Sequence, residues 1–260
     1  MSAVVDEELT AAARRRLLQM HHESGVGHIG GNLSVLDCLL VLCHEFMSPD
    51  CRLVLSKGHA AGALYIALWS AGRLEGSRLS SFHRDDTLLA GHPTVGAHDD
   101  ILFSTGSLGH GLSLAAGTAL AASLRGLERT RRVFCVTSDG EWQEGSTWEG
   151  LIFAAHHRLS NLTVLVDHNR LQGFGTTRQV ASMDPLGERL RGFDVEVSVI
   201  DGHDIAALRD ACGQRHGRPH VVVMDTIKGK GVPFMEDRME WHYLPLGDAD
   251  HAAALEGLRP

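Results

Sequence analysis

Two short apolar stretches of this sequence each end in an oxygen-bearing side chain. Residues 133–137 are followed by Asp139, and residues 162–166 are followed by Asn169. Short, continuous, Val-rich runs predict strands of a parallel sheet that helices cover on both faces, and a helix fits between these two. Because the carboxyl ends of parallel strands meet at one sheet edge, where open α/β folds bind ligands, we expect Asp139 and Asn169 to be neighbours in space.

The chemistry of this pair is that of a site for a hard cation. A carboxylate and an amide oxygen, with no thiolate nearby, suit Mg²⁺ or Ca²⁺. Mg²⁺ typically completes its octahedron with phosphate oxygens and water, so a diphosphate ligand would fit. Gly140 leaves room for the backbone to reach a diphosphate oxygen, and a carbonyl near Leu171 is a further candidate metal ligand. The alternative is structural, with Asp139 as an N-cap and Asn169 as a turn residue.

Histidines are the unusual feature of the composition, with 17 in 260 residues. Five of them lie beside glycine or at the end of a predicted element, where active-site loops concentrate: His28, His59, His92, His110 and His242. His59 falls at the start of a predicted buried helix, whose unpaired N–H groups suit an anion such as diphosphate. Simple capping of that helix by Ser56 and His59 is the alternative.

The elements that must position these residues follow from periodicity and from turn residues. Before the first central strand we expect a helix over 6–23, a glycine-rich loop over 25–34 and a helix over 35–46 that is capped by Ser34. A strand over 53–55 then leads into a buried helix. An irregular loop over 80–98 and a glycine loop over 105–111 follow, and the second loop precedes a helix of small residues. After the second central strand we expect a surface helix over 184–193, a strand from Val195, a helix over 205–215 and a strand from Val221.

The last aromatic-rich segment, residues 228–245, has no clean period. It contains too many apolar residues for a disordered tail, so we expect it either to fold over the sheet edge or to bind a partner. Together these elements predict one α/β domain over residues 1–260, with a mainly parallel sheet covered by helices on both faces.

Composition excludes several classes of function. The net charge is −8, and the arginines are scattered, so no basic face for nucleic acid or for an anionic membrane is expected. The N-terminal segment has acids before bases, the reverse of a secretory signal, and we see no uninterrupted apolar stretch of membrane-spanning length. Five cysteines without CxxC spacing predict reduced core thiols. A cytoplasmic location is therefore expected.

Six segments, taken in order, resemble motifs of the transketolase family. The segment TSDGEWQEG followed by VDHNRLQGFG resembles that family's binding motif for thiamine diphosphate and Mg²⁺. The other five are GVGHIGGNLS, LSKGHAAGALY, AGHPT, TGSLGHG and KGKGVPFMEDRMEWH. The resemblance covers nearly the whole chain, but only the diphosphate-binding, N-terminal half of a transketolase.

The resemblance implies the first subunit of a split transketolase. The pyrimidine-binding domain and the C-terminal domain would lie on a partner chain, and an α₂β₂ assembly is expected. The glutamate that activates the cofactor belongs to the pyrimidine domain, so this chain alone should not turn over. The substrates would be sugars or sugar phosphates.

Roles for individual residues are also implied by the resemblance alone. Asp139, Asn169 and the Leu171 carbonyl would hold the metal, Mg²⁺ or alternatively Ca²⁺. Gly140, His59, Asn169 and His242 would contact the diphosphate end of the cofactor, and Gly106 and Leu108 its ring. His28, His92 and His242 would face the donor sugar, bind its hydroxyls and the developing oxyanion, and transfer protons. Glu144 resembles an acid of the motif that communicates between paired sites.

Two positions depart from the family pattern. Ser138 stands where the motif usually has glycine, and His110 replaces a glutamine common in single-chain members while matching split-subunit relatives. The leading hypothesis is transfer of a two-carbon ketol unit from a ketose phosphate to an aldose. One alternative is a related thiamine diphosphate-dependent carboligation, either 1-deoxyxylulose phosphate synthase-like or onto an unusual acceptor. The other is a non-catalytic, cofactor-binding subunit.

Overall fold

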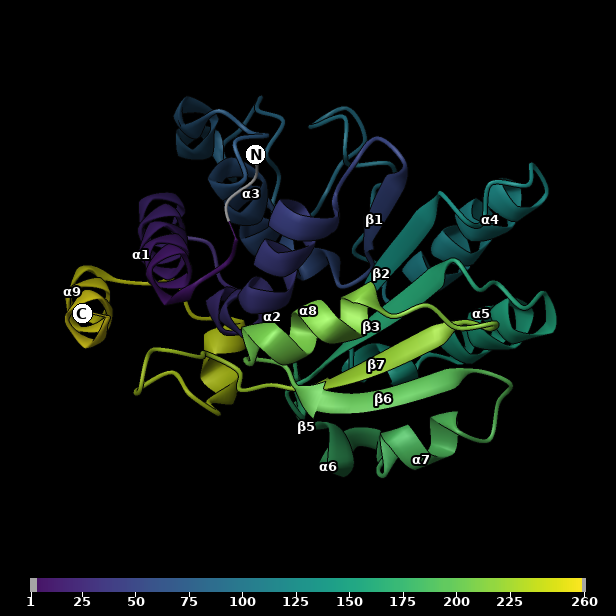
Figure 1. Ribbon diagram of the computed structural model, residues 1–260. Helices are drawn as coiled ribbons and strands as arrows, with labels where there is room; N and C mark the ends of the chain where they lie inside the picture. Colours follow the sequence, from purple (N-terminus) through teal and green to yellow (C-terminus); the bar gives the residue numbers. More distant parts are fainter. Residues whose placement is uncertain (1–3, 259–260) are drawn as a thin grey trace.

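A five-stranded parallel sheet forms the centre of the protein, seen in a computed structural model that describes residues 4–258 (Figure 1). Its strands are β1 (Cys51–Leu55), β2 (Arg132–Ser138), β3 (Leu162–His168), β6 (Glu196–Asp201) and β7 (His220–Asp225). Their order across the sheet is β1-β2-β3-β7-β6, and every neighbouring pair is parallel. The predicted α/β class is confirmed; the ends of the predicted domain, residues 1 and 260, lie outside the described residues.

Alternate residues of the central strands pack into two separate cores. In β2, Phe134 and Val136 pack into a cluster with α2 (Ile29–Val41), α3 (Ala61–Ser70) and α8 (Ile205–Gly213). Val133 and Cys135 pack into a second cluster with α4 (Gly111–Ser123) and α5 (Gly145–His156). A strand whose residues are buried on both faces must be apolar at nearly every position, which is why β2 and β3 have continuous apolar runs.

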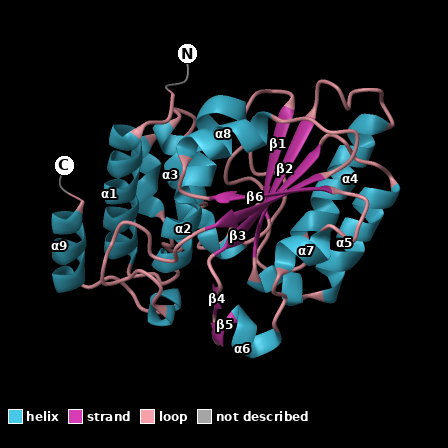
Figure 2. Ribbon diagram, turned by 60° about the horizontal axis from the view of Figure 1, so that its bottom comes forward, coloured by secondary structure: helices cyan, strands magenta, loops and turns pink. Residues whose placement is uncertain are grey.

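Smaller elements surround this three-layered body. Helices α1 (Glu7–Ser24) and α9 (Asp248–Gly257) pack against each other beyond α2 and α3, as Figure 2 shows. The remaining elements are the hairpin β4 (Leu171–Gln172) and β5 (Gly175–Thr176), the short helices α6 (Thr177–Ala181) and α7 (Leu186–Leu190), the 3₁₀ turns Gly58–Ala60, Gly76–Ser81, Gly140–Gln143 and Met239–His242, and the π-helical turn Leu42–Phe46. Asp6 caps α1 by accepting from the N–H of Leu9 (2.9 Å), and Gly25 ends the helix at φ 63°.

The predicted glycine-rich loop over 25–34 is wrong in its second half. Helix α2 begins at Ile29, directly after His28 at φ 68°, so Gly30 and Gly31 are helical residues. Glycine fits position 30 closely, because a Cβ would lie 3.1 Å from the Lys228 side chain and 3.3 Å from Trp241, and those neighbours would have to shift by a few tenths of an ångström. Gly30 therefore serves close packing of a helix against the C-terminal segment. Ser34 is consequently not a cap.

Two further expectations are refined by the structure. The surface helix predicted over 184–193 is reduced to the short helix α7, which follows Pro185. The segment 228–245 folds over the carboxyl edge of the sheet, which was the first of the two expectations for it. The N–H of Gly229 donates to the Gly30 carbonyl (2.9 Å), and the N–H of His28 donates to the His242 carbonyl (3.0 Å).

One helical stretch in the described part of the chain, Ile29–Phe46, is long and apolar enough by composition to cross a membrane. It comprises α2 and the π-helical turn after it, and 89% of it is buried inside the protein. The buried polar residues Asn32 and Asp37 lie within it. Its position is that of a core helix.

Candidate functional site

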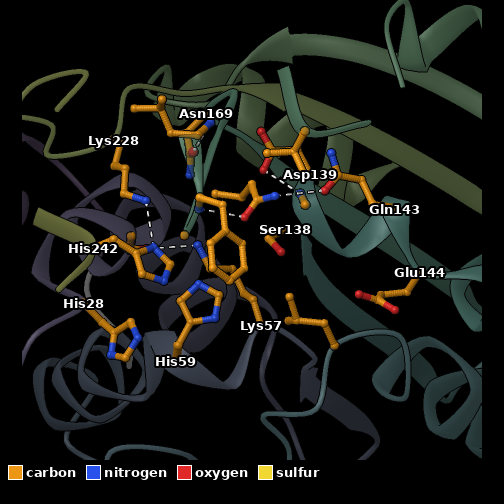
Figure 3. Close-up of a pocket in the computed structure, with 18 of the residues that line it drawn as sticks. His28, Lys57, His59, Ser138, Asp139, Gln143, Glu144, Asn169, Lys228 and His242 are labelled. Atoms are coloured by element: carbon orange, nitrogen blue, oxygen red, sulfur yellow. Dashed lines mark hydrogen bonds between the residues drawn. The ribbon is translucent and has the colours of Figure 1, made fainter. Parts of the chain in front are cut away.

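A cavity of about 520 Å³ lies at the carboxyl edge of the sheet (Figure 3). Unlike the candidate His110, the residues to which the family resemblance gave a role all line it: His28, His59, His92, Gly106, Leu108, Asp139, Gly140, Glu144, Asn169, Leu171 and His242. They come from loops after β1, β2 and β3, from the residue before α2, from the loop between residues 82 and 110 ahead of α4, and from the C-terminal segment. The fold therefore brings together residues that are scattered over most of the chain, while their individual roles stay predictions.

Asp139 and Asn169 lie at one end of this cavity, as expected from their positions after β2 and β3. Ser138 and Asp167 are register partners in the sheet, so the two strands end side by side. Asp139 Oδ1 accepts from the N–H of Gly140 (2.7 Å), which is the capping role considered as the alternative, and Oδ2 accepts from the N–H of Arg170. One carboxylate thus caps its own turn and contacts the loop that carries Asn169.

The orientation of the Asn169 amide is set by buried polar groups behind it. Its Nδ2 donates to Asp167 Oδ2 (3.2 Å) and to Ser34 Oγ (3.3 Å), which lie deeper in the protein. A carboxylate can only accept hydrogen bonds, so the NH₂ group must face Asp167. The Asn169 carbonyl oxygen is left on the other side, where it accepts from the N–H of Leu171 (3.1 Å).

Asp167 is the centre of this buried network. It forms an ion pair with Lys57 Nζ, and the side chains of both residues are 0% exposed. It also accepts hydrogen bonds from Ser34 Oγ (2.6 Å) and Thr226 Oγ1. Burial alone would raise the pKa of Asp167, but the charge and hydrogen bond of Lys57, with the two hydroxyl donors, outweigh burial and lower it. Asp167 is therefore ionised and fixed.

Asp139 shows the opposite behaviour. Burial, followed by the charge of Asp167, raises its pKa to about 6. A cation placed in the cavity beside Asp139 would stabilise the ionised form of this carboxylate. Asp139, the Asn169 amide and the Leu171 carbonyl are a hard-oxygen donor set, which fits Mg²⁺ or Ca²⁺. Residues 4–258 contain no cluster of three or more His, Cys, Asp or Glu side chains suited to a metal, so phosphate oxygens or water would have to complete the coordination shell.

Histidine rings form the other end of the cavity (Figure 3). The ring centroid of His28 lies 5.0 Å from that of His242, 5.5 Å from that of His59 and 6.1 Å from that of His92. No described residue makes a hydrogen bond to the ring nitrogens of His28, His59 or His92. These rings therefore present donors and acceptors to whatever occupies the cavity.

The histidines are neutral near pH 7. Burial, followed by the charges of His92 and Lys228, lowers the pKa of His28 to about 4. Burial and the charge of Lys228 lower the pKa of His242 to about 3, and the pKa values of His59 and His92 are lowered chiefly by burial. A neutral imidazole has one N–H donor and one acceptor nitrogen, which together match a hydroxyl group.

Sequence reasoning missed two lysines that line the cavity, Lys57 and Lys228. Both lie inside segments that carry the family resemblance, LSKGH and KGKG, and each is next to a glycine. These two features could have identified them as candidate site residues. Lys228 is 2% exposed, and its Nζ donates to His242 Nδ1 (3.0 Å). Burial and the nearby charge of Lys57 lower the pKa of Lys228 to about 8. An anion in the cavity would therefore meet two buried ammonium groups.

The loop that carries Gly106 is packed against the histidine end. Gly106 has φ 147°, and a Cβ there would lie 2.7 Å from the His92 ring. Leu108 follows on the same loop and lines the cavity. His110 is different: it is exposed at the start of α4 and lies outside the cavity lining, so the structure separates it from the other four histidines that lie beside glycine or at element ends.

The two glutamates near β2 have distinct positions. Glu144 is exposed at the rim, where it precedes α5. Glu141, which the sequence reasoning did not single out, is 0% exposed; it accepts from Ser56 Oγ, from the N–H of Gly109 (2.9 Å) and from the N–H of Ser138 (3.4 Å). Glu141 therefore joins three loops around the cavity. Ser56 binds Glu141 rather than capping a helix.

Ser138, the departure from the motif glycine, fits its position without strain. It is the last residue of β2, and its φ is not positive, so the backbone there does not require glycine. Its Oγ accepts from the N–H of Glu141 (3.3 Å) and lines the cavity.

Comparisons with known proteins identify the family of the chain. The family described as "Transketolase, thiamine diphosphate binding domain" matches residues 7–258. The chain is 36% identical over 266 residues to one of the subunits of an apulose-4-phosphate transketolase of Actinobacillus succinogenes, covering 97% of this chain and 95% of that protein. It is 35% identical over 257 residues to a 6-deoxy-6-sulfo-D-fructose transketolase subunit of Clostridium sp., covering 94% and 93% of the two chains.

The fold is similar to that of a solved transketolase from Campylobacter jejuni, with a TM-score of 0.88 and 28% sequence identity. The similarity covers 97% of this chain but 42% of that one, so this chain spans less than half of the C. jejuni transketolase.

Proposed function

This chain belongs to the transketolase family, and we propose that it is the thiamine diphosphate-binding subunit of a two-chain enzyme that transfers a two-carbon ketol unit from a ketose or ketose-phosphate donor to an aldose acceptor. One observation carries the proposal: the same cavity has oxygen ligands at one end, neutral histidines at the other, and two buried lysines, Lys57 and Lys228, in its lining. The first end suits a metal and a diphosphate. The second suits a polyhydroxylated substrate.

At the first end, Asp139, Asn169 and the Leu171 carbonyl would hold Mg²⁺, with Ca²⁺ as the second candidate. Gly140, His59, Lys57 and Lys228 would surround the diphosphate. Thiamine diphosphate supplies the electron sink for breaking and forming a carbon–carbon bond, while the protein contributes orientation and electrostatics. Gly106 and Leu108 would lie against the cofactor ring.

At the second end, His28, His92 and His242 would bind the donor hydroxyls. Because their lowered pKa values keep the rings neutral, each can donate from one nitrogen and accept at the other. The Nζ of Lys228 donates to His242 Nδ1, which leaves the proton of His242 on Nε2. That N–H is a candidate donor to oxygen that becomes negatively charged during the reaction.

A partner chain would complete the enzyme. Relatives that match over nearly their whole length are named as single subunits of transketolases, and this chain spans 42% of a solved transketolase. Phe174 (85% exposed) and Tyr243 (54% exposed) lie at the cavity rim, where a second chain could cover them. We propose that the partner carries the pyrimidine-binding domain and the C-terminal domain, in an α₂β₂ assembly, with Glu144 near the contact between paired sites.

The test is reconstitution with the product of a neighbouring gene. The mixture, with thiamine diphosphate and Mg²⁺, should transfer a ketol unit from xylulose 5-phosphate or from another ketose, and the mass of the complex should be that of an α₂β₂ tetramer. Ketol transfer by the pure single chain would contradict the split-site proposal. Cofactor binding by the complex with no transfer from any ketose would favour a non-catalytic subunit.

The named substrates of the relatives guide the choice of donors. Two relatives carry the names of transketolases for apulose 4-phosphate and for a sulfonated fructose. A donor panel should therefore include unusual ketoses beside xylulose 5-phosphate. Release of carbon dioxide from pyruvate would instead indicate the 1-deoxyxylulose phosphate synthase-like reaction.

We propose a cytoplasmic location for the protein. All five cysteines are free thiols, and Cys38, Cys43, Cys135 and Cys212 are buried, in keeping with a reducing compartment. Fractionation of the source cells with an antibody against the chain would test this location.

A further inference from the structure

Arg170 adopts an unusual backbone conformation between two of the proposed metal ligands. Its φ is 63°, in the left-handed region that residues with a Cβ rarely occupy. Asn169 precedes it and Leu171 follows it, so the direction of the Asn169 side chain and that of the Leu171 carbonyl both depend on this one residue. Such a conformation persists only where the surroundings hold it.

The backbone of Arg170 is held on both sides. Its N–H donates to Asp139 Oδ2, and its carbonyl accepts from the N–H of Thr177 (2.9 Å) at the start of α6. These bonds link the loop to β2 and to the helix after the β4–β5 hairpin, which projects from the sheet beside α6 in Figure 2. They do not reach β7, the strand next to β3.

The side chain of Arg170 supplies the connection to β7. Its Nη2 contacts Asp225 Oδ1 at 2.6 Å, and Asp225 is the last residue of β7. The same oxygen is 3.0 Å from His168 Nδ1 at the end of β3, and His168 and Asp225 are register partners. Asp225 therefore sits on the rigid sheet edge and holds the loop through Arg170, on the side away from the cavity, whose lining it does not join.

We propose that Asp225 is a positioning residue for the metal site, which acts by holding Arg170 in its left-handed conformation. This inference rests on the proposed function for the roles of Asn169 and Leu171. The ion pair is partly exposed, 54% for the Arg170 side chain and 44% for that of Asp225, so its contribution should be modest. Partners behind metal ligands commonly tune affinity in this way.

Substitution at both positions separates this role from a general structural one. Asp225→Ala should free the Arg170 side chain and let the loop leave the left-handed conformation. Arg170→Gly should remove the need for the ion pair, because glycine adopts φ near 63° without a Cβ penalty. Asp225→Ala should then have no further effect in the Arg170→Gly background. Asp184→Ala is the matched control, because Asp184 lies 3.6 Å from His168 Nε2 but makes no ion pair with Arg170.

The first measurement is hydrogen exchange of the backbone amide at position 170 in the cofactor-free full chain. We expect about fivefold faster exchange in Asp225→Ala, the upper end for an exposed ion pair, and wild-type exchange in Asp184→Ala. Unchanged exchange in Asp225→Ala would overturn the proposal. So would an equal effect of Asp225→Ala in the Arg170→Gly background, since Asp225 would then act through His168.

The second measurement is the affinity for Mn²⁺ in the presence of saturating thiamine diphosphate, followed by the spin-resonance signal of free Mn²⁺. The dissociation constant should rise about fivefold in Asp225→Ala and should be restored by adding Arg170→Gly. A wild-type chain that binds neither Mn²⁺ nor thiamine diphosphate, alone or with its partner, would count against the proposed function, and the exchange measurement would still decide the role of Asp225.

Discussion

The two ends of the cavity are built in different ways. At the oxygen end, Asn169 is oriented by Asp167 and Ser34, and Asp167 is in turn paired with the fully buried Lys57. At the histidine end, the rings of His28, His59 and His92 have no hydrogen-bond partner among residues 4–258. The first end is held by the protein itself. The second is left with donors and acceptors for a ligand.

This difference indicates where substitutions should damage the fold and where they should damage only binding. A buried, paired network loses much stability when one member is removed. Replacing a ring that faces the cavity and makes few contacts with the protein should reduce the free energy of unfolding only slightly. The following predictions test that contrast, from the largest expected effect to the smallest.

Asp167→Ala should reduce the free energy of unfolding by about 3–5 kcal/mol, because it leaves the ammonium of Lys57 buried and unpaired. Chemical denaturation of the cofactor-free chain measures the loss. The double variant Lys57→Met with Asp167→Leu should be more stable than Asp167→Ala, since no uncompensated charge remains. A double variant that is no more stable would contradict the view that the unpaired charge causes the loss.

Asp139→Asn should abolish metal-dependent binding of thiamine diphosphate yet stabilise the cofactor-free fold by about 2 kcal/mol at pH 7.5. Removing the charge relieves about 3 kcal/mol of ionisation cost. About 1 kcal/mol of this gain is lost because the amide can accept only one of the two backbone N–H groups, of Gly140 and Arg170, that the carboxylate accepts. The pKa of Asp139 is raised to about 6 in the fold, from an ordinary value of 3.8, so the fold favours the protonated carboxyl. The cost of ionising Asp139 therefore develops as the pH rises from about 4 through 6 and is complete above that range.

Unfolding curves at pH 4 and pH 7.5, with calorimetric titration of the cofactor in Mg²⁺, measure both effects of Asp139→Asn. An advantage over the wild type that is equal at the two pH values would show that ionisation of Asp139 is not its cause.

In His28→Gln, the free energy of unfolding should fall by about 1 kcal/mol less than in the wild type when the solution is acidified. This figure is reduced for the partial exposure of the ring. The pKa of His28 is lowered to about 4 in the fold, so the unfolded chain takes up a proton first as the pH falls below about 6.5. Stability is then lost between about pH 6.5 and pH 4. Thermal unfolding across this interval should show a smaller decline in His28→Gln than in the wild type. An identical decline would remove His28 as a cause.

Ser138→Gly should have the smallest effect, a loss of about 1 kcal/mol or less in the free energy of unfolding. The change restores the usual motif glycine, removes the long hydrogen bond from the Glu141 N–H (3.3 Å) and gives the unfolded chain more backbone freedom. Denaturation and the affinity for thiamine diphosphate measure the outcome. A large loss of affinity would mean that the Ser138 hydroxyl is itself a ligand of the cofactor.

Much of the oxygen end could be predicted from the sequence. Apolar runs reveal strands because both faces of β2 and β3 are buried, and strand ends reveal Asp139 and Asn169 because parallel strands share an edge. The order of the strands could not be predicted in this way. Placement of β7 between β3 and β6 depends on long-range pairing that leaves no mark on local periodicity.

The start of α2 could not be predicted for a similar reason. Gly30 and Gly31 suggest a loop when read locally, but Gly30 lets a helix approach Trp241 and Lys228, which lie far along the chain. The left-handed backbone of Arg170 could not be predicted either, because arginine rarely adopts it, and that of His28 is uncommon even though histidine is one of the residue types enriched there. The burial of Lys57 and Lys228 and the partners of their ammonium groups could not be predicted from the sequence, because both depend on contacts between distant parts of the chain.

The backbone bond between His28 and His242 bears on when the site can exist during protein synthesis. The N–H of His28 donates to the carbonyl of His242, so the histidine end is closed by an early and a late part of the chain. A ribosome releases the sheet strands β1, β2 and β3 well before Trp241 and His242 emerge. A nascent chain can thus possess the oxygen ligands while its histidine end is still open, and only a chain translated past His242 can complete the cavity.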